Sequence, residues 1–211
     1  MFLKYIYNMA LSLEPSQLIQ FFTAMSPLLL AFFLVAISIF NQDAKGLVYL
    51  GGVLVGSFAW LIMLFLIKSP TNPDRADSCN MINWPFNITA FNNPNYSSYF
   101  IAFTMAYLIL PMYFNNQVNY MVLVFLLVLF VSDAYSSVVK KCTPVSGPII
   151  GAIIGLLMGS GWFTMFHATG HDDLLYFQEV MSNAVVCKRP EKQTFKCSVY
   201  RKGELISSSV I

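Results

Sequence analysis

The chain has 211 residues, of which 57% are hydrophobic and only 10% are charged, and its formal net charge is +2. Because a typical soluble domain carries about 25% charged residues, this composition predicts an integral membrane protein with the lipid bilayer as its surroundings. The small net charge gives no long-range field that would attract nucleic acid or an acidic substrate, so we predict no nucleic-acid partner.

Five apolar stretches approach or exceed the length of about 20 residues that a helix needs to cross a bilayer. The first follows a helix-start signal at Glu14-Pro15-Ser16, and residues 1–13 before it suit a short helix at the membrane interface. The third carries Pro111 near its end and is separated from the fourth only by 115–117, which predicts a tight antiparallel hairpin. The predicted spans are 18–40, 46–67, 97–114, 118–139 and 147–166.

These spans predict an all-α membrane protein with five transmembrane helices in a domain over residues 1–166. The remaining residues, 167–211, form a predicted extramembrane tail with a short helix around 174–181 and a small β-hairpin or meander.

Asp133 is the only charged residue inside a predicted span. Ser136 and Ser137 follow it by one helical turn, and Ser132 lies beside it, so these residues form a polar stripe. One interpretation is a proton or cation site in a pore or transporter. The other, which we favour, is a cluster of hydrogen bonds between helices.

The fifth span contains glycine at every fourth position, which places the four glycines along one helical face and allows close approach of another helix. Two interpretations remain open. The face packs within the monomer, for example against two glycines of the second span, or it associates with a second copy. The helix-packing residues are Gly147, Gly151, Gly155 and Gly159, with Gly52 and Gly56 as their predicted partners.

His167 and His171 are four residues apart and are followed by Asp172 and Asp173, a composition that suits a metal site. Gly170 lies between the two histidines at a usual helix-stop position, so the single helical face that both ligands need is not expected. We therefore predict a polar cap at the interface, with no metal and no cofactor.

The tail beyond residue 185 alternates apolar and polar side chains from Phe195 to Tyr200, which indicates a strand. Cys187 and Cys197 either form a disulfide across a hairpin or remain buried thiols. About 28 residues cannot bury enough surface to be stable alone, so we expect the tail to be cross-linked, to pack on the short helix around 174–181, or to dock on a partner. Its basic face suits an acidic protein surface or anionic lipid headgroups.

Five spans define two sides of the membrane. Side A contains the amino terminus and the loops 68–96 and 140–146, and side B contains the loop 41–45 and the tail. The lysines and arginines near the spans place side A in the cytoplasm, and we favour this rule. The near-span cations are Lys4, Lys68, Arg75, Lys140 and Lys141 on side A and Lys45 on side B.

Two other features bear on sidedness. The glycosylation acceptor sequences Asn87-Ile88-Thr89 and Asn95-Tyr96-Ser97 lie in the 68–96 loop and would place side A in the lumen. The cysteines divide evenly, with Cys79 and Cys142 on side A and the tail pair on side B. Because normally only one side is oxidising, one pair is expected to be a disulfide and the other to remain thiols.

The segment 187–203, Cys-Lys-Arg-Pro-Glu-Lys-Gln-Thr-Phe-Lys-Cys-Ser-Val-Tyr-Arg-Lys-Gly, is attached to an apolar multi-span body. It resembles uncharacterised membrane proteins of large nucleo-cytoplasmic DNA viruses. The resemblance implies a protein of the internal virion membrane that exposes its tail to the capsid shell or the core, and it implies no catalytic residues.

The sequence contains no Gly-x-Ser-x-Gly, phosphate-binding loop, dinucleotide fingerprint or His-Glu-x-x-His, so we predict no enzymatic activity. Our leading hypothesis is a structural or assembly protein of a viral or host membrane, partnered by further copies of itself or by other membrane or capsid proteins. The alternative is a small oligomeric channel or transporter with Asp133 lining the path.

Overall fold

The computed structural model describes residues 15–76, 79, 91–177, 196–201 and 204–210. The chain divides into two compact units, residues 1–179 and residues 180–211. The predicted interfacial helix at residues 1–13 lies outside the described residues.

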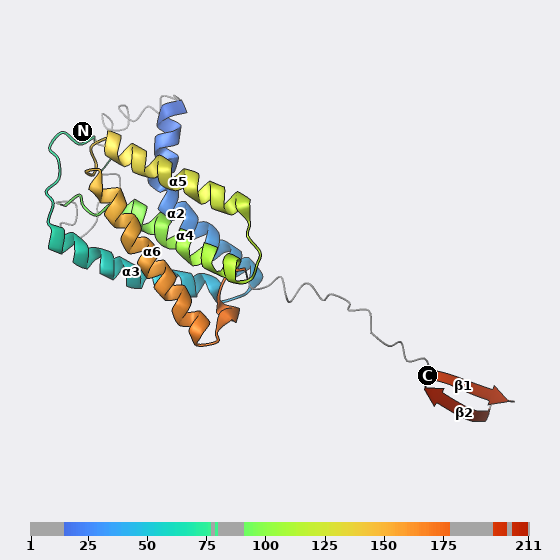
Figure 1. Cartoon of the computed structure of the whole chain (residues 1–211). Helices are drawn as coiled ribbons and strands as arrows, with labels where there is room; N and C mark the ends of the chain where they lie inside the picture. The colour runs from blue at the N-terminus through green and yellow to red at the C-terminus, as the bar shows by residue number, and fades with distance from the viewer. Residues whose placement is uncertain (1–14, 77–78, 80–90, 178–195, 202–203, 211) are drawn as a thin grey trace. The chain divides into compact units, whose positions relative to one another are not determined.

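The first unit is a bundle of long apolar helices (Figure 1). Four of them, α3 to α6, are long and apolar enough to cross a membrane, and in α2 the stretch Met25–Asn41 is a shorter apolar helix. The chain is therefore a helical, multi-pass membrane protein, and a fifth crossing by α2 stays a prediction. The helices are α2 (Pro15–Asn41), α3 (Lys45–Ile67), α4 (Tyr96–Phe114), α5 (Tyr120–Val139) and α6 (Ser146–Ala168).

Local signals in the sequence mark where the helices begin and end. The Asn119 side chain accepts hydrogen bonds from the backbone N–H groups of Met121 and Val122, at 3.1 and 3.3 Å, and so caps α5. Lys68 ends α3 in a left-handed conformation, with its N–H bonded to the Leu64 carbonyl. Because only 115–119 connects α4 to α5, these two helices run antiparallel and pack on each other.

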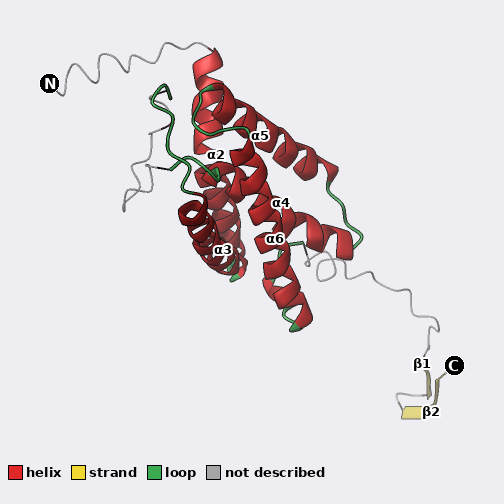
Figure 2. Cartoon of the chain, turned by 60° about the vertical axis from the view of Figure 1, so that its left-hand side comes forward, coloured by secondary structure: helices red, strands yellow, loops and turns green. Residues whose placement is uncertain are grey.

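Helix α4 is the centre of the bundle and contacts α2, α3, α5 and α6 (Figure 2). Of its most apolar 18-residue window, 67% is buried, against 11% for α5, so α4 is the core helix and α5 a peripheral one. Tyr99, Phe103 and Tyr107 are fully buried on α4, and the last two rings stack at 6.2 Å. Pro111 lies buried in the last turns of α4.

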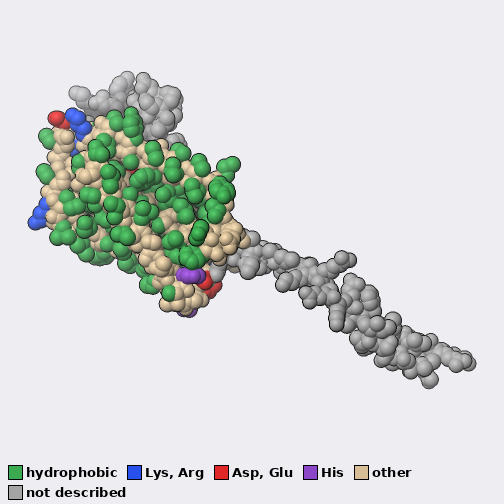
Figure 3. Space-filling model, viewed as in Figure 1, with side chains coloured by type: hydrophobic (Ala, Val, Ile, Leu, Met, Phe, Trp, Pro, Cys, Tyr) green, Lys and Arg blue, Asp and Glu red, His purple; other side chains and the backbone are tan. Residues whose placement is uncertain are grey.

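Large apolar side chains cover the outside of the bundle, as expected where lipid replaces water as the solvent. Figure 3 shows these side chains over the middle of one face, with Lys and Arg at one end and His at the other. Exposed examples include Phe32 and Phe33 on α2, Leu54 and Phe58 on α3, and Met121 on α5.

The second unit contains a two-stranded antiparallel sheet of β1 (Lys196–Arg201) and β2 (Glu204–Val210). Lys196 pairs with Val210 and Arg201 with Glu204, with a register shift between Val199 and Tyr200. The wider meander and the pairing of Cys187 with Cys197 stay predictions, since residues 178–195 lie outside the described residues. The predicted helix around 174–181 is described only over 174–177. Of these residues, Leu174 is the last residue of the short 3₁₀ helix η3 (Asp172–Leu174), and the other three are not helical.

Candidate functional site

A polar network joins α4 to α5 inside the membrane domain. Asp133 of α5 is 4% exposed, and its carboxylate accepts hydrogen bonds from two hydroxyls of α4. Ser97 Oγ donates to Oδ1 at 2.7 Å, and Ser98 Oγ donates to Oδ2 at 3.0 Å. Both carboxylate oxygens are thus engaged, which offsets the cost of placing this group away from water.

The network continues through Asn95, the residue before α4. Its Nδ2 donates to Ser98 Oγ at 2.9 Å and to Ser137 Oγ at 3.3 Å. The amide of Asn95 is therefore engaged between the two helices, at a residue that the sequence offers as a glycosylation acceptor.

These partners are those of a hydrogen-bond cluster between helices, the interpretation that the sequence favoured, but the donors are α4 hydroxyls rather than the serines of the polar stripe on α5. Within the described chain, Asp133 bonds to the α4 hydroxyls and makes no hydrogen bond to Ser132, Ser136 or Ser137. Only Ser137 joins the network, through Asn95. The reason is geometric, because the α4 hydroxyls approach the carboxylate from across the interface. Ser97 and Ser98 are consecutive at the start of the third span, and this pair of hydroxyls is the signal in the sequence for donors on α4.

The segment before α4 is also fixed to the start of α6. The Asn95 backbone N–H donates to the Gly147 carbonyl at 3.1 Å, and Asn93 Nδ2 donates to Ser146 Oγ at 3.0 Å. Thr143 Oγ1 donates to the Asn92 carbonyl at 2.6 Å. The side-A ends of α4, α5 and α6 are therefore held together by polar contacts.

Three of the four α6 glycines face α4 of the same chain. A Cβ on Gly151 would lie 2.5 Å from the Asn95 carbonyl oxygen, and one on Gly159 would lie 2.5 Å from that of Phe103. A Cβ on Gly155 would overlap the Tyr99 carbonyl oxygen and come within 2.8 Å of the Phe103 nitrogen. Real Cβ atoms do not approach backbone this closely, so these positions bring the two backbones into contact.

The other three glycines have different neighbours from those predicted. A Cβ on Gly52 would lie 2.6 Å from the Trp162 ring, and one on Gly56 would overlap the Tyr99 hydroxyl. A Cβ on Gly147 would overlap the side chain of Thr143, in the turn before α6. The α3 glycines therefore accommodate bulky side chains from α6 and α4, and the partner of the α6 glycine face is α4 rather than α3.

On side B, a second polar cluster surrounds the turn between α2 and α3. Ser38 Oγ lies 2.7 Å from the Asp43 carboxylate and accepts from the Gly46 N–H at 2.8 Å. The ammonium of Lys45, which is buried, lies 4.0 Å from the same carboxylate. This cation is thus part of the helix junction, with its charge balanced locally.

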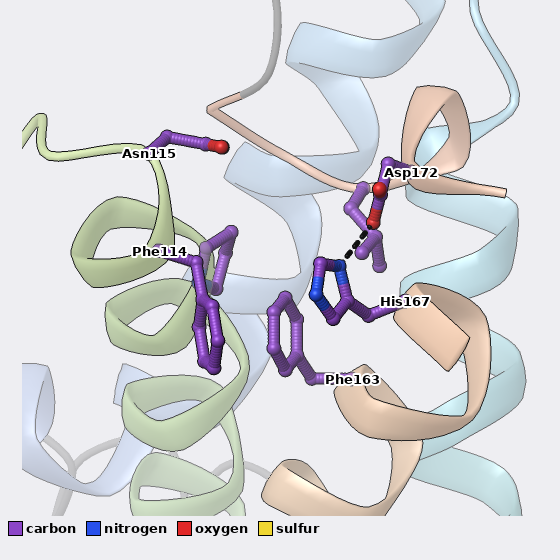
Figure 4. A pocket seen from close by; sticks show the side chains of 7 residues that line it. Phe114, Asn115, Phe163, His167 and Asp172 are labelled. Carbon is purple, nitrogen blue, oxygen red and sulfur yellow. Dashed lines mark hydrogen bonds and ion pairs between the residues drawn. The ribbon is translucent and has the colours of Figure 1, made fainter. Parts of the chain in front are cut away.

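A small hollow at the side-B end contains His167, with lining residues from α4, α6 and the segment that follows (Figure 4). The Nδ1 atom of His167 lies 2.7 Å from Asp172 Oδ1, and the imidazole ring stacks on Phe163 with centroids 5.4 Å apart. Phe114 of α4 lies against the same imidazole at 5.1 Å. The histidine therefore links α6 to the turn after it and to the end of α4.

His171 is not brought to His167. α6 ends at Ala168, and the His171 backbone N–H bonds to the Phe166 carbonyl at 3.1 Å, which closes a turn. In the described ranges, no three His, Cys, Asp or Glu side chains lie close enough together to hold a metal ion.

Cys79 and Cys142 form a disulfide with their Cα atoms 5.5 Å apart. It joins the loop after α3 to the turn after α5, and closes a loop across 63 positions of the sequence.

No protein-family model matches the chain, and neither a curated protein nor a solved structure matches it.

Proposed function

We propose that this chain is a structural or assembly protein of a membrane, in which the helical bundle is a fixed anchor and the tail binds a partner. The observation that carries the proposal is the use of Asp133, the only carboxylate deep in a crossing helix, as a bond between helices. Both of its oxygens accept hydroxyl donors from α4, so the polar groups that a conducting path needs are committed to holding the bundle together.

The glycine face of α6 supports the same proposal. α4 of the same chain covers it at Gly151, Gly155 and Gly159, with backbone in contact with backbone. A contact this close leaves no room for a water-filled path between α4 and α6. It also means that a second copy of the chain would bind at another surface.

The site of action that we propose is the internal membrane of a large nucleo-cytoplasmic DNA virus, or a host membrane during its assembly. The resemblance of segment 187–203 supports this location. The proposed partners are further copies, other membrane proteins or capsid proteins, which would meet the basic tail.

Current recordings from the purified chain in planar bilayers test the proposal against the alternative of a channel. We expect the chain and its Asp133→Asn variant to leave the conductance at the level of the empty bilayer. Ser160→Ala is the matched control, because among the described residues the Ser160 hydroxyl bonds only to carbonyls of its own helix. A conductance that Asp133→Asn abolishes and Ser160→Ala preserves would contradict the proposal and favour a channel.

A further inference from the structure

Two loops on side A are joined by more than their cysteines. Besides the disulfide between Cys79 and Cys142, the Ala76 N–H donates to the Lys140 carbonyl at 3.2 Å. The ammonium of Lys141 lies 3.9 Å from the Asp74 carboxylate. The two loops are therefore held together by a backbone hydrogen bond and an ion pair in addition to the disulfide.

The helices place these loops on one side of the membrane. α3 and α5 end there, and α4 and α6 begin there. Four crossings put residues 68–95 and 140–145 on the same side and residues 42–44, 115–119 and 169–177 on the other, whether or not α2 also crosses.

The chemistry of the disulfide then determines which side is which. Its formation removes two protons and two electrons from the Cys79 and Cys142 thiols, and a disulfide oxidant accepts them by thiol–disulfide exchange. Such bonds form and persist in oxidising compartments and are rare in the cytosol, where thiols are kept reduced. We infer that side A of this protein faces an oxidising compartment, and that side B, with His167 and the basic tail, faces the reducing cytosol.

This orientation opposes the one that the near-span cations favour. The charge rule is a statistical bias over short loops, whereas the persistence of a disulfide depends directly on the redox state of the compartment. On side B the tail alone contains six of the 12 Lys and Arg residues of the chain. The inferred orientation puts the tail, with those six cations, on the cytosolic side of the membrane, whose leaflet is the anionic one.

The inference also assigns the second pair of cysteines. Because Cys187 and Cys197 belong to side B, they remain thiols in the cell and do not form the disulfide that their spacing allows. The inference is independent of the proposed function, since an anchor and a channel are both compatible with either orientation.

The redox state of the unmodified chain is the first test. Cells expressing the protein are quenched in acid, the denatured chain is alkylated, and it is then reduced and treated with a second alkylating reagent of different mass. Peptide mass spectrometry should find the first reagent on Cys187 and Cys197 and the second on Cys79 and Cys142. The inference is overturned by the reverse pattern, by four free thiols, or by four oxidised cysteines.

The second test measures sidedness with two matched loop variants. Val118 in the α4–α5 loop and Val145 before α6 are both exposed and lie on opposite sides. Both variants also carry Cys187→Ser and Cys197→Ser, because free thiols on side B would react as well. In sealed microsomes with the cytosolic face outward, a membrane-impermeant maleimide should modify Val118→Cys directly and Val145→Cys only after detergent opens the vesicles. Modification of Val145→Cys in sealed vesicles, or protection of Val118→Cys, would overturn the inference.

Discussion

The central helix α4 is held in opposite ways by the two helices that follow it in the chain, α5 and α6. α6 meets it through missing side chains, because Gly151, Gly155 and Gly159 bring backbone against backbone. α5 meets it through added polar groups, because Asp133 accepts hydrogen bonds from α4 hydroxyls. The α6 contact is also the more extensive of the two.

The difference shows how helices associate where lipid removes the hydrophobic drive between them. Dispersion over a close contact and hydrogen bonds between helices are the two remaining sources of attraction. The bundle uses close contact for its main interface and hydrogen bonds for α5, a peripheral helix whose residues are mostly exposed or half-buried. The two contacts should therefore respond to different substitutions.

The largest effect is expected from breaking the α4–α6 contact. Changing Gly151 and Gly155 together to Leu places side chains where the α4 backbone lies, so the helices must separate. We expect little folded protein in detergent, by size-exclusion chromatography and thermal unfolding. The control is Ile149→Leu with Ile153→Leu on the exposed face of the same helix, which should fold normally. Equal behaviour of the two double variants would contradict the predicted contact.

A smaller effect is expected at the α4–α5 contact. Ser98→Ala removes a hydroxyl that donates to Asp133, and Asp133→Asn removes the negative charge of the group that accepts this hydrogen bond. A double-mutant cycle on thermal unfolding in detergent should give a coupling of about 0.6–1.7 kcal/mol, the range found for hydrogen bonds between membrane helices. The same cycle with Ser160→Ala in place of Ser98→Ala should give none. A coupling of zero for the first pair would show that this bond does not stabilise the bundle.

The smallest effect is expected where α3 meets α4. The Tyr49 hydroxyl lies 2.7 Å from Thr104 Oγ1, which itself donates to the Phe100 carbonyl at 2.9 Å. Tyr49→Phe should therefore cost only about 0.6 kcal/mol of unfolding free energy, since Thr104 keeps a partner. Tyr135→Phe, on the exposed face of α5, is the control and should cost nothing. If Tyr49→Phe lost much more unfolding free energy than the coupling measured between Ser98 and Asp133, the predicted order of the contacts would be wrong.

Much of the helical fold could be predicted from the sequence because hydropathy and length are local properties. The bounds of α3 to α6 lie within two residues of the predicted spans, and the short link at 115–117 indicated the hairpin. Hydropathy does not reveal which apolar helix is central. The third predicted span is the shortest and carries Pro111 near its end, yet the helix that it forms, α4, is the one that the others surround.

The partners at the candidate site were harder to predict, because they depend on how the helices pack. Four-residue spacing indicated a close contact along α6 but not the helix that makes it. A signal was present in Ser98, Ala102 and Ala106, which repeat at the same interval on α4, and Ala102 and Ala106 lie against Gly155 and Gly159. The charge of Asp133 within a span indicated hydrogen bonds between helices, but the spacing along α5 does not reveal that the donors lie on α4.

Comparing a single added methyl group at two glycines of α6 tests the central claim most directly. Gly155 lies against the α4 backbone, whereas a Cβ on Gly161 would meet nothing within 4 Å. Thermal unfolding in detergent should show that Gly155→Ala loses about 1–3 kcal/mol of stability, as overpacked cores do, while Gly161→Ala is unchanged. Equal stability of the two variants would contradict a backbone contact between α4 and α6.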